Sequence, residues 1–173
     1  AVTKRADGSD ELLIVSSDKD LSQLVSPKTK QLLPPPTANP KLGWRLLDEG
    51  AVSDKFGVPP SGILDYLSII GDQSDNIPGL MGVGPKTAQK WMGEHGNLEN
   101  LIENAGRLTP KRFCSLVYEK RSDLIRNRDL IRLESDVEFD MNSCPQVDLN
   151  DLKEILLELE MNKSWEQAQV RYA

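Results

Sequence analysis

The chain has 173 residues, with 21 Lys and Arg against 27 Asp and Glu, so its formal net charge is −6. This acidity argues against a protein that binds nucleic acid through a uniformly basic surface. No apolar run approaches the roughly 20 residues of a membrane span. Two cysteines, Cys114 and Cys144, make neither a disulfide framework nor a zinc spacing. We therefore expect a cytoplasmic globular protein with no membrane partner.

Local charge differs strongly from the average. Residues 1–105 hold 10 basic and 14 acidic groups, residues 106–132 hold 8 and 3, and residues 133–173 hold 3 and 10. The net charges of these segments are therefore −4, +5 and −7. The middle segment, here called the basic belt, lies between two acidic stretches and could extend a phosphate contact or form solvated helix faces.

The first predicted element is a buried strand in the apolar run of residues 11–17. Leu21, Leu24 and Val25 follow with helical spacing, and Lys30–Leu33 is a candidate second strand. The prolines from Pro34 to Pro40 predict an irregular connector, because each removes a backbone donor.

Helices are predicted from Asp48 onward. Asp48 and Asn97 are typical N-caps, Gly57 a typical helix end and Pro85 a typical first helical residue. Further helices are predicted to start at Ser61, after Thr109-Pro110 and at Ser122, and the acidic tail to end in a helix with Leu152, Ile155, Leu156 and Leu159 on one face. The chain is therefore expected to be mostly helical with one or two strands, whose unpaired edges require the rest of a sheet from elsewhere.

The first candidate site is the pair Asp18 and Asp20, at the carboxyl end of the predicted strand. Side chains two apart on an extended segment face the same way, and this end of a parallel sheet is where ligands bind. The alternative is a helix-capping aspartate with a solvated neighbour.

The second candidate is the pair Asp72 and Asp75, directly after an apolar helix. Carboxylates three apart at a helix end can converge on Mg²⁺ or Mn²⁺, which prefer oxygen ligands. A polar turn with a capping aspartate is the alternative. A calcium loop is excluded, because Ile77 stands where its glycine is required.

The third candidate is the glycine hairpin, residues 79–84, which leads into a helix at Pro85. Glycines let a backbone approach phosphates closely, and a helix N-terminus presents unpaired N–H groups to anions. Lys86 and Lys90 lie one helical turn apart and could pair with neighbouring phosphates. A tight helix–helix turn is the alternative, but the lysines favour binding of a phosphate backbone.

Four stretches together resemble a known family. They are Ser17-Asp-Lys-Asp-Leu-Ser-Gln-Leu-Val25, Phe56-Gly-Val-Pro-Pro60, Leu64-Asp-Tyr-Leu-Ser-Ile-Ile-Gly-Asp-Gln-Ser-Asp-Asn-Ile-Pro-Gly79 and Gly82-Val-Gly-Pro-Lys-Thr-Ala88. In this order they resemble the bacterial 5′→3′ exonuclease family, which comprises the N-terminal nuclease domain of DNA polymerase I and its stand-alone relatives. The family belongs to the flap-endonuclease superfamily.

The resemblance implies an α/β fold for the intact protein, with a parallel-sheet nuclease core and a helix-three-turn-helix region that binds DNA. It divides this chain into a remnant of the catalytic core (1–44), the helical DNA-binding region (45–133) and an acidic helical segment (134–173). It implies hydrolysis of DNA at 5′ ends or flaps by two Mg²⁺ or Mn²⁺ ions, which activate water and stabilise the leaving oxygen.

The resemblance also assigns residues. The metal-binding carboxylates would be Asp18, Asp20, Asp72 and Asp75. The hairpin, which holds K⁺ in some members, would bind duplex backbone through Gly79, Gly82, Val83, Gly84, Lys86, Thr87 and Lys90.

The family's earlier half, which carries its first metal-binding carboxylates and helical arch, has no counterpart here. The expected partners are therefore duplex DNA with a 5′ end or flap, the missing half of the nuclease domain and a following polymerase domain. The alternative is a non-catalytic fragment that binds DNA structure. His95, the one histidine, is expected to be structural.

Overall fold

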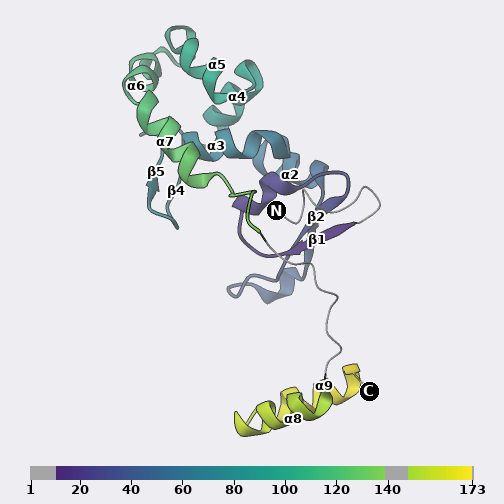
Figure 1. The fold of residues 1–173 in the computed structure, drawn as a ribbon. Helices are drawn as coiled ribbons and strands as arrows, with labels where there is room; N and C mark the ends of the chain where they lie inside the picture. The colour runs from purple at the N-terminus through teal and green to yellow at the C-terminus, as the bar shows by residue number, and fades with distance from the viewer. Residues whose placement is uncertain (1–10, 139–147, 173) are drawn as a thin grey trace. The chain divides into compact units, whose positions relative to one another are not determined.

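The computed structural model describes residues 11–138 and 148–172, so Cys144 lies outside the described residues. They belong to two compact units, the first ending at Val137 and the second starting at Glu138 (Figure 1). The predicted division at residues 44 and 133 stays a prediction. Most described residues are helical, as the sequence predicts.

The described part of the first unit begins with a three-stranded sheet in the order β1-β2-β3. β1 (Leu12–Val15) and β2 (Thr29–Leu33) are parallel, and β3 (Arg45–Leu47) is antiparallel to β2. The first two strands lie where they were predicted. The third was not expected, because three residues after a proline-rich loop are too few to show an alternating pattern.

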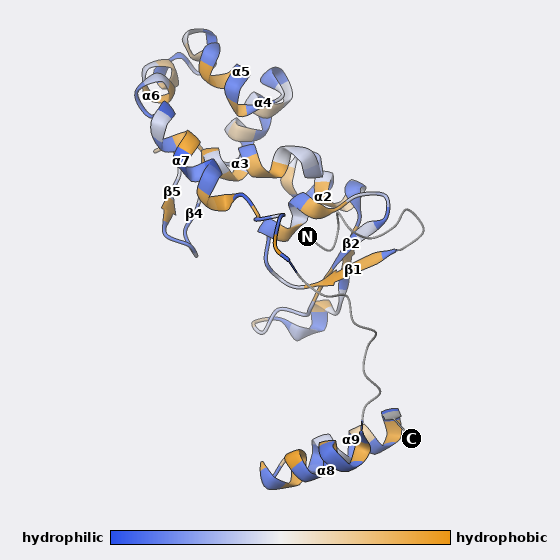
Figure 2. Cartoon of the chain, viewed as in Figure 1, coloured by the Kyte–Doolittle hydropathy of each residue, from blue (hydrophilic) through white to orange (hydrophobic). Residues whose placement is uncertain are grey.

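One face of this sheet is apolar and open. Leu13 and Val15 are 54% and 59% exposed, and Leu46 on β3 is 50% exposed. Leu32 connects these strands, since it is paired with Val15 on one side and with Leu46 on the other. β1 is an edge strand of the described sheet, and Figure 2 shows it in the colour of hydrophobic residues.

Six α-helices of the first unit follow the sheet. They are α2 (Glu49–Phe56), α3 (Ile63–Ile70), α4 (Pro85–His95), α5 (Leu98–Glu103), α6 (Cys114–Glu119) and α7 (Arg121–Ile131). The predicted caps Asp48 and Asn97 are confirmed, because their side chains accept hydrogen bonds from the backbone N–H groups of Ala51 and Asn100, each at 2.8 Å. Gly57 ends α2 in the left-handed conformation, and Pro85 is the first residue of α4, as predicted.

The predicted starts at Ser61 and Ser122 are wrong. Pro60–Gly62 form a 3₁₀ turn that runs directly into α3, and α7 already begins at Arg121, after Lys120 with ψ near 10°. An N-cap requires an extended residue before the helix. At both places the chain enters the helix from another helical turn, so neither serine can serve as a cap.

Between α3 and α4 the chain makes a small antiparallel hairpin of β4 (Gly71–Asp72) and β5 (Ile77–Pro78). The helices enclose a core centred on Trp91, which is fully buried and meets the Phe113 ring edge-on at 5.6 Å. The indole N–H of Trp91 donates to the Thr109 carbonyl at 2.9 Å, so its one polar group is satisfied. Ile77 of β5 belongs to the same core, and the Asn127 side-chain amide donates to the Pro78 carbonyl at 2.8 Å, which together hold the β4–β5 hairpin at the end of α3.

The second unit contains α8 (Leu149–Glu158) and α9 (Asn162–Tyr172). One helix was predicted here. The second was missed, although Trp165, Ala168 and Tyr172 stand at i, i+3 and i+7 in the sequence. In neither described range is any helix long and apolar enough to cross a membrane.

Candidate metal centre

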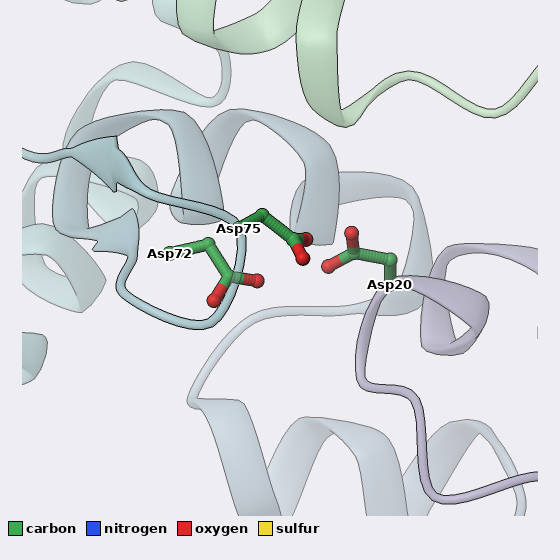
Figure 3. A group of neighbouring side chains, drawn as sticks. All are labelled: Asp20, Asp72 and Asp75. Carbon is green, nitrogen blue, oxygen red and sulfur yellow. The ribbon is translucent and has the colours of Figure 1, made fainter.

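Three carboxylates from separate parts of the first unit converge. One oxygen from each of Asp20, Asp72 and Asp75 lies within 4.8 Å of the others, and Figure 3 shows their carboxylates turned toward one another. Asp20 starts the 3₁₀ helix η1 (Asp20–Leu24), Asp72 ends β4, and Asp75 lies in the turn before β5. Asp20 and Asp72 are buried, whereas Asp75 is exposed. Sequence reasoning paired Asp72 with Asp75, and the fold adds Asp20 to them.

Asp18 lies beside this group but outside the three. Its Oδ1 accepts a hydrogen bond from the Asp20 backbone N–H at 3.0 Å, which turns the chain after β1. Asp18, Lys19 and Asp75 instead line an open cleft of about 390 Å³ next to the carboxylates, together with Ser16, Ser17 and Ser74. Asp18 and Asp20, which the sequence pairs, therefore occupy different positions. Asp18 lines the cleft, and Asp20 belongs to the carboxylate group.

Asp72 is held in its charged form by its neighbours. Burial by itself would raise its pKa, but hydrogen bonds from Lys19 and Ser74 hold the pKa below its usual value. The Lys19 ammonium lies 2.5 Å from Asp72 Oδ1, and both the hydroxyl and the backbone N–H of Ser74 donate to the same oxygen. This oxygen is therefore a fixed anionic point beneath the cleft.

Asp20 has the opposite electrostatics. Burial raises its pKa to about 6, and the nearby charges of Asp18, Asp72 and Asp75 act in the same direction. Its Oδ1 is buried without a hydrogen-bond partner. Such an oxygen is costly unless a proton or a cation satisfies it. The three possible metal ligands are all carboxylate oxygens, and they lie within 4.8 Å of one another. Such a set of oxygen ligands fits a hard divalent cation.

Lys19 and Ser74 were missed by sequence reasoning. Each lies within a predicted motif, between Asp18 and Asp20 or between Asp72 and Asp75. Their roles depend on contacts across the fold, since the Lys19–Asp72 ion pair joins residues 53 positions apart. Only their position inside acidic motifs was a signal that could have pointed to them.

The glycine hairpin lies beyond β5 and leads into α4. Gly82 has a φ of +77°, which L side chains rarely adopt, and Gly84 is the exposed residue before Pro85. Lys86 and Lys90 are exposed on α4, with Lys90 lying 3.7 Å from Glu94. The backbone and the two lysines are therefore accessible to an anionic ligand.

Three other residues predicted to bind DNA, in the hairpin and at the start of α4, are less exposed. A Cβ on Gly79 would lie 2.1 Å from the Ile70 carbonyl oxygen, so this glycine permits close packing against the end of α3. Val83 is buried and Thr87 is half-buried. These three residues support the shape of the hairpin.

Most cations of the basic belt contact groups of the same unit. Arg128, which is largely buried, pairs with Glu99 and lies near Asp65, and Asp123 pairs with both Lys120 and Arg126. Such pairing neutralises part of the belt's positive charge. For Lys120, Arg126 and Arg128, this pairing favours the helix-face interpretation over a phosphate contact.

The sequence of the chain matches that of DNA-processing proteins. Residues 58–154 match the family model described as "5'-3' exonuclease, C-terminal SAM fold". The chain is 36% identical over 154 residues to a thermostable DNA polymerase I of Thermus filiformis, which covers 87% of this chain and 18% of that protein. It is also 36% identical over 152 residues to a 5'-3' exonuclease of Aquifex aeolicus, covering 86% of this chain and 49% of that protein.

A solved structure agrees with the sequence matches. The bacteriophage T5 D15 flap endonuclease, in a pseudo-enzyme–product complex with DNA and metal ions, superposes with a TM-score of 0.61 at 21% identity over 70% of this chain and 43% of that one. The likeness shows a shared fold. This chain belongs to the 5'-3' exonuclease family through its C-terminal SAM-fold region. It spans about half, or less, of the length of these curated relatives.

Proposed function

We propose that this chain is the part of a 5′→3′ exonuclease and 5′-flap endonuclease that supplies several metal-binding carboxylates and the grip on duplex DNA. The observation that carries the proposal is the convergence of Asp20, Asp72 and Asp75, with one buried oxygen of Asp20 left unpaired. Family membership and the metal- and DNA-bound T5 structure support it.

In this proposal Asp20, Asp72 and Asp75 hold one Mg²⁺ or Mn²⁺ ion, and Asp18 and Asp75, which line the cleft, face a second. The bound ions supply Lewis acidity toward the scissile phosphodiester and its leaving oxygen. Asp20, whose pKa is about 6, binds an ion in its ionised form, and Ser74 orients Asp72. The cleft beside Lys19 is where the phosphate would lie.

The glycine hairpin would bind the duplex at a distance from the site of cleavage. Gly82 and Gly84 expose backbone N–H groups to phosphates, and Lys86 and Lys90 add charge on the first turns of α4. These are contacts to the sugar–phosphate backbone, so we propose binding without sequence specificity.

The remaining metal ligands would come from a segment corresponding to the part of the A. aeolicus exonuclease that this chain does not match. The open edge of β1 and the apolar face around Leu13 and Val15 suit such a segment, because an unpaired edge can add a strand. The polymerase I relatives make a following polymerase domain part of the proposal, with bacterial cytoplasm as the compartment.

The test is cleavage of a labelled 5′ flap by the chain joined to that unmatched A. aeolicus segment, with Mg²⁺ or Mn²⁺. We expect cutting that Asp72→Ala abolishes while duplex binding persists. A control variant, Lys86→Ala with Lys90→Ala, should lose duplex affinity and its salt dependence. Full cutting by the Asp72→Ala protein would overturn the site.

A second candidate function is binding of DNA structure without catalysis by the chain alone. It is favoured because residues 11–138 and 148–172 contain one candidate cation group, made of three carboxylates, whereas the proposed cleavage uses two ions. Salt-sensitive flap binding by the 173-residue chain with no cleavage in Mn²⁺ would support it, and cleavage by that chain would contradict it.

A further inference from the structure

A buried glutamine lies under the loop that carries Asp18 and Asp20. Gln31 is on the inward face of β2 and is completely buried, between the buried Thr29 and Leu33. An amide taken out of water without hydrogen bonds costs a few kcal/mol, whereas an apolar side chain at this position would cost none. A glutamine here is therefore tolerated only where its polar atoms are satisfied.

The amide of Gln31 is satisfied entirely by that one loop. Its Nε2 donates to the Ser16 carbonyl at 3.0 Å and to the Asp18 carbonyl at 2.6 Å, and its Oε1 accepts from the Ser22 hydroxyl at 2.8 Å. Both amide hydrogens and the oxygen are in use. The three partners bracket Asp20 on the chain, two before it and one after it.

The backbone hydrogen bonds between β1 and β2 stop where this loop begins, so side-chain hydrogen bonds must hold the loop in place. The last ladder contact of β1 runs from the Ser16 N–H to the Leu32 carbonyl at 3.1 Å. Beyond it, Asp20 is held close to Asp72 and Asp75 against the repulsion of like charges. A loop held only by its own turn could relax away from these charges, and the Gln31 amide opposes that movement.

We propose that Gln31 is a positioning residue for the divalent-cation site: through the Ser16 and Asp18 carbonyls it fixes the loop so that the Asp20 carboxylate faces Asp72 and Asp75. Gln31 does not touch the ion. Ser22 keeps the amide oriented, so its loss has a smaller effect. This inference rests on the proposed function, because it needs Asp20 to be a cation ligand.

The test measures Mn²⁺ binding to the full 173-residue chain by electron paramagnetic resonance titration, with Mn²⁺ alone as the probe. Gln31→Met keeps the volume and removes all three bonds, and we expect about 10-fold or greater weakening, as for other residues that orient metal ligands. Ser22→Ala should weaken binding by about 3-fold, since one bond of three is lost.

The matched control is Gln89→Met. Gln89 lies on α4, outside the carboxylate group. Its side-chain amide donates one hydrogen bond, to the Phe56 carbonyl at 2.9 Å. Unfolding by urea is measured for every variant. A Gln31→Met protein that is less stable but binds Mn²⁺ as the wild type does would overturn the inference, since a purely structural role predicts that result.

If Gln31→Met does not fold, Ser22→Ala decides: unchanged Mn²⁺ affinity overturns the inference and a fall supports it. Asp20→Asn separates the two proposals. If the Mn²⁺ affinity is unchanged in Asp20→Asn, or if the wild type binds no Mn²⁺, the proposed site is overturned as well. Binding that depends on Asp20 but not on Gln31 overturns only the role of Gln31.

Discussion

Asp20 is the residue at which burial and charge conflict most. Its pKa of about 6, raised by burial and then by three neighbouring aspartates, means that the folded chain binds this proton more tightly than the unfolded chain does. A carboxyl whose pKa is raised on folding adds stability below its unfolded pKa near 4, and this stability is lost as the pH rises through the folded pKa. Without metal, the neutral-pH protein therefore carries a destabilising charge.

We expect Asp20→Asn to be more stable than the wild type at pH 7.5 in a chelator, by up to about 3 kcal/mol from a shift of two pKa units. The difference should shrink as the pH falls from about 7 to 4. Urea unfolding across this range is the measurement. A difference that stays constant with pH would contradict the assignment of this titration to Asp20.

Lys19 acts at the same scale as an internal cation. Its ammonium lies 2.5 Å from Asp72 Oδ1, on the carboxylate that a divalent ion would share with Asp20 and Asp75. In the absence of metal the lysine neutralises part of the charge of the three carboxylates. A divalent ion that binds Asp72 competes with it.

We therefore expect Lys19→Met to bind Mn²⁺ about 10-fold more tightly, a change of about 1.4 kcal/mol, and to be less stable than the wild type in a chelator. Isothermal titration measures the affinity. The control is Lys55→Met, which removes a lysine that lies over the Phe56 ring. Weaker Mn²⁺ binding by Lys19→Met would show that the lysine assists the ion rather than competing with it.

At the scale of elements, two glycines of the glycine hairpin have different roles. Gly82 is required by its positive φ, whereas Gly84 has an ordinary φ of −100° and open space where a Cβ would lie. The first serves the turn. The second leaves room for an approaching molecule.

Gly82→Ala should destabilise the chain by about 1–2 kcal/mol, the cost of a left-handed conformation for an L residue. Gly84→Ala should change stability by less than about 0.5 kcal/mol but weaken duplex binding, because its methyl group points into the open space. Thermal unfolding and fluorescence anisotropy with a labelled duplex measure the two effects. Equal effects of both substitutions on stability would refute this separation.

The elements themselves were predicted well where the signal is local. Asp48 and Asn97 cap helices as expected because a cap depends on a few neighbouring residues. Ser61 and Ser122 failed because what precedes each helix is another helical turn, which a serine does not reveal. β3 was missed for the related reason that its pairing with β2 is a contact across the proline-rich loop.

The candidate site was predicted in part, for the same physical reason. Acidic pairs are visible in the sequence, but which of them meet depends on how β1 and the β4–β5 hairpin are brought together. Lys19, Ser74 and Gln31 contribute through ion pairs and hydrogen bonds that no periodicity encodes. Gln31 left one trace, a polar residue at an inward position of a strand.

At the scale of the whole molecule, the sheet has a surface that water solvates poorly. Leu13 and Val15 are more than half exposed on an edge strand, the arrangement that promotes association between chains. We expect the 173-residue chain to self-associate with rising concentration and Leu13→Lys to reduce this. Sedimentation velocity measures it.

The control for this prediction is Leu130→Lys, because Leu130 is similarly exposed, at 64%, but lies on α7. It should leave the association unchanged. A wild-type chain that stays monomeric at about 100 μM, where weak strand pairing would be populated, would contradict the prediction.

The contact between Gly71 and Gly79 has a consequence for the whole molecule. A Cβ on Gly71 would lie 2.3 Å from the Gly79 backbone nitrogen, so the two ends of the β4–β5 hairpin are locked together at the end of α3. Asp72 and Asp75 lie inside that lock, and Gly82 and Gly84 follow directly from it. Under the proposed function, the reacting phosphate and the held duplex are therefore a fixed span apart. The 13 residues from 72 to 84 would therefore set the distance along the DNA between the bound duplex and the cutting position.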